Sequence, residues 1–283
     1  MFTRDKYLIK SGGREIDFDR VSEYKSLLSP RLRKFANLII SNVKYITFNQ
    51  LISDMDSCFD DFADKIRDKP FKILNETRKL GSSQWLTNIF QQRIETLNFE
   101  GFITEKFKEP IDFDILVIDD FSCTGVQLMK NVIETFLAEY FYIDYNGGII
   151  DKSSLQNFTF HFIIPYLSQR ATNRIVNTLN HYSDELGIKI NYNIYTSAVK
   201  ITSLYDLMTE NPIVLQQYQS FGIQDMYACL IYFDHKIGNS FASVPNILVN
   251  GFVPNQNINY GSLLIDFPDE SGKKEYIKAM TIL

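Results

Sequence analysis

The sequence is poor in cysteine and has no long apolar run. Its three cysteines (Cys58, Cys123 and Cys229) are too few and too widely separated for the disulfide framework of a small secreted protein or for a paired zinc site. The longest aliphatic run, 115–118, falls far short of the roughly 20 residues that a membrane helix needs. The first residues contain no apolar segment long enough for a signal peptide. We therefore expect a soluble, cytoplasmic protein with no membrane partner.

The sequence also lacks an excess of basic residues. It has 29 Lys and Arg against 34 Asp and Glu in 283 residues, a formal net charge of −5. This balance argues against a broad nucleic-acid footprint, although a local basic patch stays open. The composition is 45% apolar and 22% charged, which is typical of a globular chain that buries a large core. The 23 Phe and 16 Tyr residues are best explained by that core.

The periodicity of apolar residues changes near residue 69. Before it the pattern is helical, with a helix start at Ser29-Pro30. After it, short apolar strands alternate with helices, which predicts an α/β fold with a doubly wound, mostly parallel sheet. We expect a helical region at 1–68, a core at 69–201, and an extension at 202–283 that completes the sheet and forms a loop-rich hood. The expected strands are 71–74, 102–103, 113–118, 158–164, 188–194 and 228–233, and the expected helices are 48–66, 85–97, 126–140, 171–186 and 203–218.

One segment combines the features of a phosphate-sugar site. The apolar strand 115–118 is followed by Asp119-Asp120, a short loop, and a helix from Val126. Ligands of doubly wound sheets bind at the carboxyl ends of strands, and the N–H groups at a helix start favour phosphate. The paired carboxylates suit ribose hydroxyls and Mg²⁺. In the loop, Ser122 and Thr124 add hydroxyl donors beside Cys123, and Gly125 permits close approach.

This segment resembles the phosphoribosyl-pyrophosphate signature of type I phosphoribosyltransferases. The resemblance covers about 14 residues closely, and the strand–helix order is compatible over roughly 69–201. It implies that Asp119 and Asp120 hold the ribose hydroxyls and the metal, and act in catalysis. It implies that residues 122–125 wrap the 5′-phosphate. The activity would be glycosyl transfer at the anomeric carbon, with pyrophosphate leaving.

Members of that family also bind pyrophosphate after the first core strand. The matching segment here is 78–83, between the strand 71–74 and a helix. Small residues would let backbone N–H groups approach the diphosphate, and a lysine would supply charge. An ordinary helix cap explains this segment equally well. The candidate residues are Lys79, Gly81, Ser82 and Ser83.

Three departures from the family pattern leave a second function open. Gln127 stands where active members carry a hydroxyl residue, Cys123 stands where several carry a carboxylate, and 101–112 leaves little room for a mobile covering loop. The alternative is a catalytically reduced, nucleotide-sensing module with a protein or nucleoprotein partner. Divergent members of the superfamily of this kind resemble components of bacterial antiviral, retron-type systems. The sequence leaves a homo-oligomer open.

Other interpretations of these residues compete with the first. A Walker B strand would need an upstream G-x-x-x-x-G-K-[ST] segment, which the sequence lacks. A purely structural interpretation leaves Asp120 and Thr124 as helix caps. His161 lies in an expected buried strand and is better explained as a core residue. On the acceptor side, the candidates are His235, Lys236 and Asn239, with an ordinary turn as the alternative.

Overall fold

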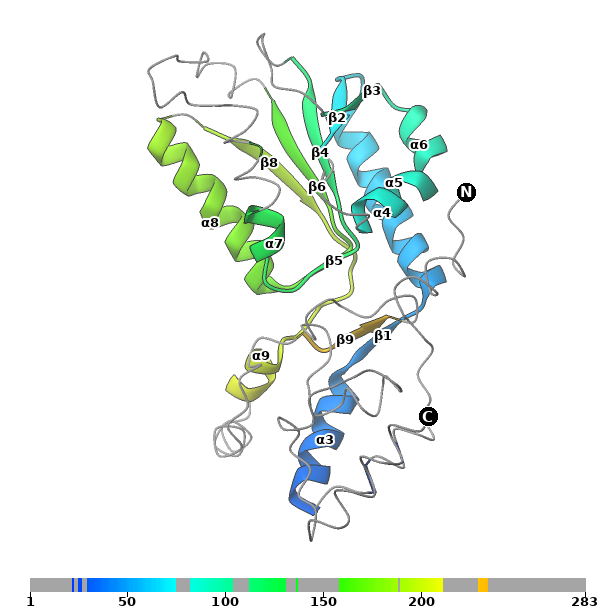
Figure 1. Ribbon diagram of the computed structural model, residues 1–283, viewed down its shortest axis with the longest axis vertical. Coiled ribbons are helices and arrows are strands. Elements are labelled where there is room, and N and C mark those ends of the chain that lie inside the picture. The colour runs from blue at the N-terminus through cyan, green and yellow to red at the C-terminus, as the bar shows by residue number, and fades with distance from the viewer. Residues whose placement is uncertain are drawn as a thin grey trace, which may run out of the picture. The chain divides into compact units, whose positions relative to one another are not determined.

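We describe a computed structural model of the chain, over residues 22, 25–26, 30–74, 82–103, 112–130, 136, 158–187, 189–210 and 229–233. The chain divides into two compact units (Figure 1). The first comprises residues 1–2 and 49–200 and contains the main sheet. The second comprises residues 3–48 and 201–283.

The main sheet has five parallel strands in the order β3-β2-β4-β6-β8. The α/β architecture and the parallel sheet expected from the sequence are therefore confirmed. The strands that form this sheet are β2 (Phe71–Ile73), β3 (Phe99–Phe102), β4 (Asp114–Ile118), β6 (Thr159–Ile163) and β8 (Asn191–Tyr195).

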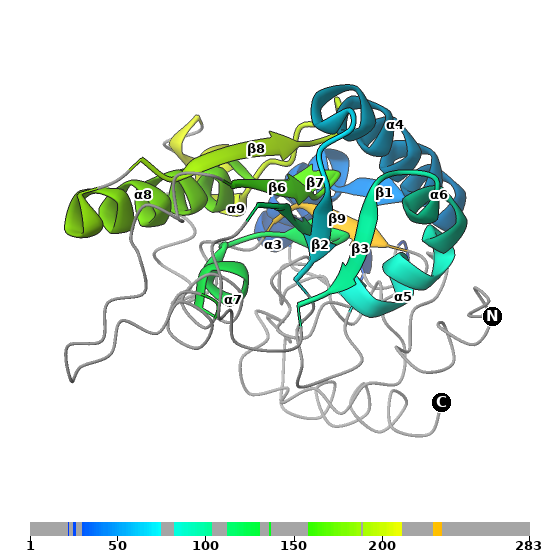
Figure 2. The ribbon, with the colours of Figure 1, turned by 90° about the horizontal axis from the view of Figure 1, so that it is seen from above.

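Helices cover both faces of this sheet, as Figures 1 and 2 show. On one face lie α4 (Phe48–Ile66), α5 (Ser82–Ile89) and α6 (Gln91–Glu95). On the other face lie α7 (Val126–Leu128) and α8 (Gln169–Leu186). One continuous helix was expected over 85–97, but the structure has two helices that meet at Phe90.

The two faces of β6 show why the sheet needs both layers. Because successive side chains of a strand point to opposite faces, Phe160 and Phe162 pack with Ile175 and Leu179 of α8. His161 points to the α4 face, where its ring makes an edge contact with Phe62 at 5.1 Å between centroids. The strand is buried throughout except at Thr159. A strand buried on both faces is typical of a parallel sheet covered by helices.

A buried polar network lies on the α4 face at the amino end of β4. The Asp114 carboxylate accepts hydrogen bonds from the Lys69 ammonium at 2.5 Å, the Thr159 N–H at 2.7 Å and His161 Nε2 at 3.0 Å. His161 Nδ1 lies 2.7 Å from the Tyr195 hydroxyl. His161 is 2% exposed, so its expected role as a core residue is confirmed. Burial alone would raise the pKa of Asp114, but these hydrogen bonds and the Lys69 charge hold that pKa below its usual value of 3.8.

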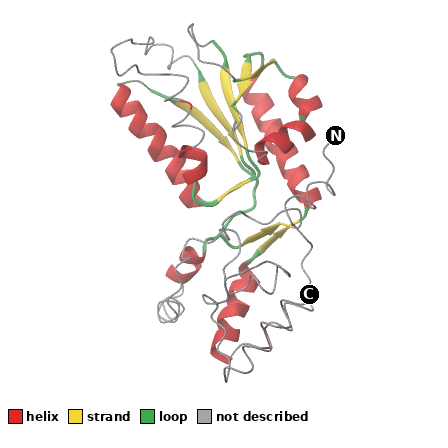
Figure 3. Cartoon of the chain, viewed as in Figure 1, coloured by secondary structure: helices red, strands yellow, loops and turns green. Residues whose placement is uncertain are grey.

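The second unit contains a small parallel sheet of its own. It pairs β1 (Lys44–Ile46) with β9 (Ile231–Phe233), and the helices described in full in this unit include α3 (Pro30–Asn42) and α9 (Leu204–Thr209) (Figure 3). Helix α9 begins with a reciprocal capping box between Ser203 and Asp206. Strand β9 was expected to complete the main sheet, but it pairs with β1 instead.

Candidate functional site

The main sheet reverses its winding between β2 and β4. The chain leaves β2 through α5 to reach β3 on one side, and it leaves β4 through α7 to reach β6 on the other. Such a reversal is a topological switch point, and ligands of open α/β sheets bind outside the carboxyl ends of the strands there. The segments after β2 and β4 therefore define the candidate site. They contain the two loops selected from the sequence.

Asp119 and Ser82 join these two segments directly. Ser82 is the first residue of α5, and Asp119 follows the last residue of β4. The Ser82 hydroxyl donates a hydrogen bond to Asp119 Oδ1. Asp119 is partly exposed and also accepts the Asp120 N–H at 2.9 Å. Two residues 37 positions apart, chosen separately from the sequence, thus meet at the switch point.

Asp120 differs from Asp119 in its burial. Its exposed fraction is 0%, whereas Asp119 is intermediate. Adjacent side chains at the end of a strand point to opposite faces. The carboxylates of Asp119 and Asp120 therefore do not face a ligand together. The charge of Asp120 acts on Tyr166, the first residue of β7 (Tyr166–Leu167).

Tyr166 is a buried residue of this edge that sequence reasoning missed. Its hydroxyl donates a 2.6 Å hydrogen bond to Asp54 Oδ2 on α4, which links that helix to the segment after β6. Burial, then the hydrogen bond to Asp54, then the charges of Asp54, Cys58 and Asp120 raise the pKa of Tyr166 far above its usual value. One signal was in the sequence: Tyr166 follows an apolar strand, as Asp119 does.

The loop 121–125 is held in place by the start of α8. Its first residues form β5 (Phe121–Ser122), which pairs with β7. The Ser122 carbonyl accepts the Ser168 N–H at 3.1 Å, and the Cys123 carbonyl accepts the Ser168 hydroxyl. Cys123 is only 6% exposed. Its carbonyl and that of Ser122 therefore face the α8 start.

Gly125 has a structural reason to be glycine. Its φ is 66°, and an added Cβ would lie 3.1 Å from the Ala171 carbonyl oxygen of α8. The sequence suggested that this glycine admits a ligand, but the backbone of α8 occupies the position next to it. Thr124 is partly exposed, and its hydroxyl lies 3.4 Å from the Val126 N–H at the start of α7. Thr124 thus remains the better placed of the two for a ligand.

Only some of the site residues predicted from the sequence lie among the described residues. Ser83 lies in the first turn of α5, where its carbonyl accepts the Thr87 hydroxyl at 2.7 Å. The remaining candidates lie outside the described residues: Lys79, Gly81, His235, Lys236 and Asn239.

The described residues lack both a metal-binding cluster and a membrane-spanning helix. They contain no group of three or more His, Cys, Asp and Glu side chains arranged to hold a metal ion. No helix among them combines the length and apolar character needed to cross a membrane.

Comparison with known proteins does not assign the chain to a family. No protein-family model matches it, and the searches of curated proteins and of solved structures gave no significant match. The class defined by the described residues is an α/β protein with a five-stranded parallel sheet and a candidate site at its switch point. Its function has to be argued from that site.

Proposed function

We propose that the protein is phosphoribosyltransferase-like and binds phosphoribosyl pyrophosphate, or a related nucleotide, at the switch point between β2 and β4. The observation that carries the proposal is the hydrogen bond from Ser82 to Asp119. It brings the segment that resembles a pyrophosphate loop next to the segment that resembles a ribose-phosphate motif. Both segments follow neighbouring parallel strands, so they share one edge of the sheet, and this hydrogen bond joins them there.

Each group at this edge has a role in holding such a ligand. Asp119 is partly exposed and accepts hydrogen bonds, which suits the hydroxyls of a ribose. The start of a helix favours phosphate, and Ser82 places the start of α5 at this edge, where a diphosphate would lie. The Thr124 hydroxyl is a further donor beside α7.

Mg²⁺ fits the donor set, because hard carboxylate oxygens and phosphate oxygens are its preferred ligands. Asp119 is the accessible carboxylate that would hold it, and Asp120 would need to move to join it. The ion would supply positive charge to a leaving diphosphate. In the transfer, a bond forms between an acceptor atom and the anomeric carbon as the bond from that carbon to the diphosphate oxygen breaks.

The burial of Asp120 supports the second candidate function, a sensor that binds the ligand without turnover. A carboxylate at 0% exposure cannot contact a ribose in this conformation. Asp119 alone could still hold a ligand at the switch point. Binding and turnover therefore have to be measured separately.

The test is calorimetric titration of the full chain with Mg²⁺ and phosphoribosyl pyrophosphate, followed by assays of pyrophosphate release with nucleobases. We expect Asp119→Asn to weaken binding by about tenfold or more, since a hydrogen bond to a charged group is worth roughly 1.5–3 kcal/mol. The matched control is Asp64→Asn, an exposed position on α4, which should bind as the wild type does. Binding with pyrophosphate release supports the transferase, and binding without it supports the sensor. If the wild type binds neither phosphoribosyl pyrophosphate nor nucleotides, both candidates are wrong.

A further inference from the structure

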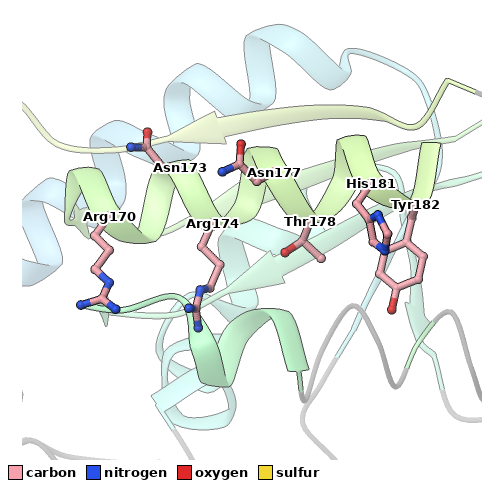
Figure 4. Close-up of a pocket in the computed structure, with 7 residues that line it drawn as sticks. All are labelled: Arg170, Asn173, Arg174, Asn177, Thr178, His181 and Tyr182. Atoms are coloured by element: carbon pink, nitrogen blue, oxygen red, sulfur yellow. The ribbon is translucent and has the colours of Figure 1, made fainter. Parts of the chain in front are cut away.

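A groove of about 500 Å³ runs along α8, and its described lining includes neither Asp119 nor Ser82. The described part of its lining comes from α8, and Figure 4 shows several of these side chains on the flank of the helix that faces α7. Its volume lies in the range of small-molecule sites. Along that flank, the side chains follow one another in the order Arg170, Arg174, Thr178, His181 and Tyr182.

The chemistry of this series changes along the helix. Two guanidinium groups occupy one end, and their rigid forks match the oxygens of a phosphate. Thr178 follows one turn later with a hydroxyl that both donates and accepts. The far end carries two aromatic rings, His181 and Tyr182, whose centroids lie 5.7 Å apart. Arg174 and Tyr182 are eight residues apart, which is about 12 Å along a helix that rises 1.5 Å per residue.

We propose that this groove on α8 binds a nucleotide, with its phosphate at Arg170 and Arg174, its ribose near Thr178 and its base at His181 and Tyr182. The order of charge, hydroxyl and aromatic ring matches the order of phosphate, sugar and base in such a ligand. The spacing from Arg174 to Tyr182 is about the length of a nucleoside monophosphate. This second site goes beyond the proposed function and does not rest on it.

The charge at the arginine end favours an anion. No described carboxylate forms an ion pair with Arg174, which is half-buried in the helix flank. The acidic partner in this stretch is at the other end, where Glu185 Oε1 lies 3.3 Å from His181 Nε2. Positive charge is thus concentrated where the phosphate would lie.

The groove also borders the loop that leads into α7. An added Cβ at Gly125 would lie 3.3 Å from Cβ of Arg174, so the stem of this arginine packs against the glycine. A ligand held by the Arg174 guanidinium would therefore contact the helix next to the switch-point loop. Nucleotide bound here is placed to influence that loop.

The test uses the full chain and four ligands: adenosine monophosphate, guanosine monophosphate, adenosine and inorganic phosphate. We expect a monophosphate to bind and Arg174→Gln to weaken it by about tenfold, the loss typical of a charged hydrogen bond. Arg174→Lys should restore part of the affinity. Two controls, Arg67→Gln at an exposed arginine outside the groove and Asn180→Ala on an exposed face of α8, should bind like the wild type.

The outcomes separate this proposal from the proposed function. Loss of monophosphate binding in Arg174→Gln, with binding retained in Asp119→Asn, supports the α8 site. Loss in Asp119→Asn with no change in Arg174→Gln would place the nucleotide at the switch point and overturn the α8 site. Equal affinity for inorganic phosphate and monophosphate would overturn the roles given to Thr178, His181 and Tyr182. Equal affinity for adenosine would overturn the role of the arginines. Thermal unfolding of each variant checks that the fold is intact.

Discussion

The two ends of β4 carry carboxylates in opposite circumstances. At the amino end, Asp114 is 4% exposed and is held by Lys69, Thr159 and His161. At the carboxyl end, Asp119 is partly exposed and contacts the hydroxyl of Ser82. A carboxylate enclosed by donors within the protein stabilises the fold, whereas an accessible one can exchange its donor for a ligand. We therefore assign a structural role to Asp114 and propose a binding role for Asp119.

The largest effect on stability should come from the amino end. Asp114→Ala leaves the His161 side chain buried without its carboxylate and removes the acceptor of Lys69. The substitution removes three hydrogen bonds to a buried carboxylate, each worth about 1.5–3 kcal/mol, so we expect the largest loss here. Urea titration of the variant and the wild type measures this loss as the difference in their free energies of unfolding. A loss below about 1 kcal/mol, the value of an exposed pair, would contradict the structural role.

The same network predicts how stability changes with acid. The pKa of Asp114 is lower in the folded protein than its usual value of 3.8, so the stabilisation is fully present above that pH. It is lost as the pH falls through the lower, folded-state pKa. Unfolding measured from pH 6 to pH 2.5 should show a steeper loss in the wild type than in Asp114→Asn. If the free energy of unfolding falls with pH equally in the two proteins, the Asp114 carboxylate is not the cause of the acid sensitivity.

At the carboxyl end, the next effect should come from Gly125. Gly125→Ala places a Cβ at positive φ and 3.1 Å from the Ala171 carbonyl oxygen. Backbone strain of this kind costs about 1–3 kcal/mol. Urea unfolding measures the loss, and Gly187→Ala is the matched control. Gly187 has the same φ of 66° with open space around it, so a smaller loss there isolates the contact with α8.

Tyr166→Phe should have an effect of similar size to that of Gly125→Ala. It removes the hydrogen bond to Asp54 while the ring stays buried, and such a bond to a charged group is worth about 1.5–3 kcal/mol. Tyr192→Phe, at a partly exposed ring in β8, provides the control in the same unfolding experiment. Equal stability of the two variants would mean that the contact between Tyr166 and α4 contributes nothing.

The smallest effect on stability should come from Asp119 itself. Asp119→Asn keeps the size and an acceptor oxygen at a partly exposed position, so we expect a change within about 0.5 kcal/mol. Thermal unfolding beside the Asp64→Asn control measures it. A loss of stability as large as that of Asp114→Ala would contradict the different roles given to the carboxylates at the two ends of β4.

The positions of strands followed from the sequence because a buried parallel strand is apolar on both faces. Strand β4 was expected at 113–118 and lies at Asp114–Ile118, and β6 was expected at 158–164 and lies at Thr159–Ile163. Helix α8 begins at Gln169, two residues earlier than expected. The reason is the Ser168 hydroxyl, which caps it by accepting the Ala171 N–H at 3.0 Å.

The site was harder to predict than the strands. The sequence identified Asp119 and Ser82 by their places after strands, but not their direct contact. The burial of Asp120 was missed, although the alternation of side chains along a strand already separates neighbouring carboxylates. The link between Tyr166 and Asp54 joins residues 112 positions apart, and no local pattern encodes such a distance.

The most direct test of the switch-point site is a crystal structure of the protein with Mg²⁺ and phosphoribosyl pyrophosphate. We predict that the ribose lies within hydrogen-bond distance of the Asp119 carboxylate and that the diphosphate contacts the first N–H groups of α5. Density for the ligand elsewhere, with the Ser82–Asp119 hydrogen bond undisturbed, would contradict the assignment of this edge of the sheet as the binding site.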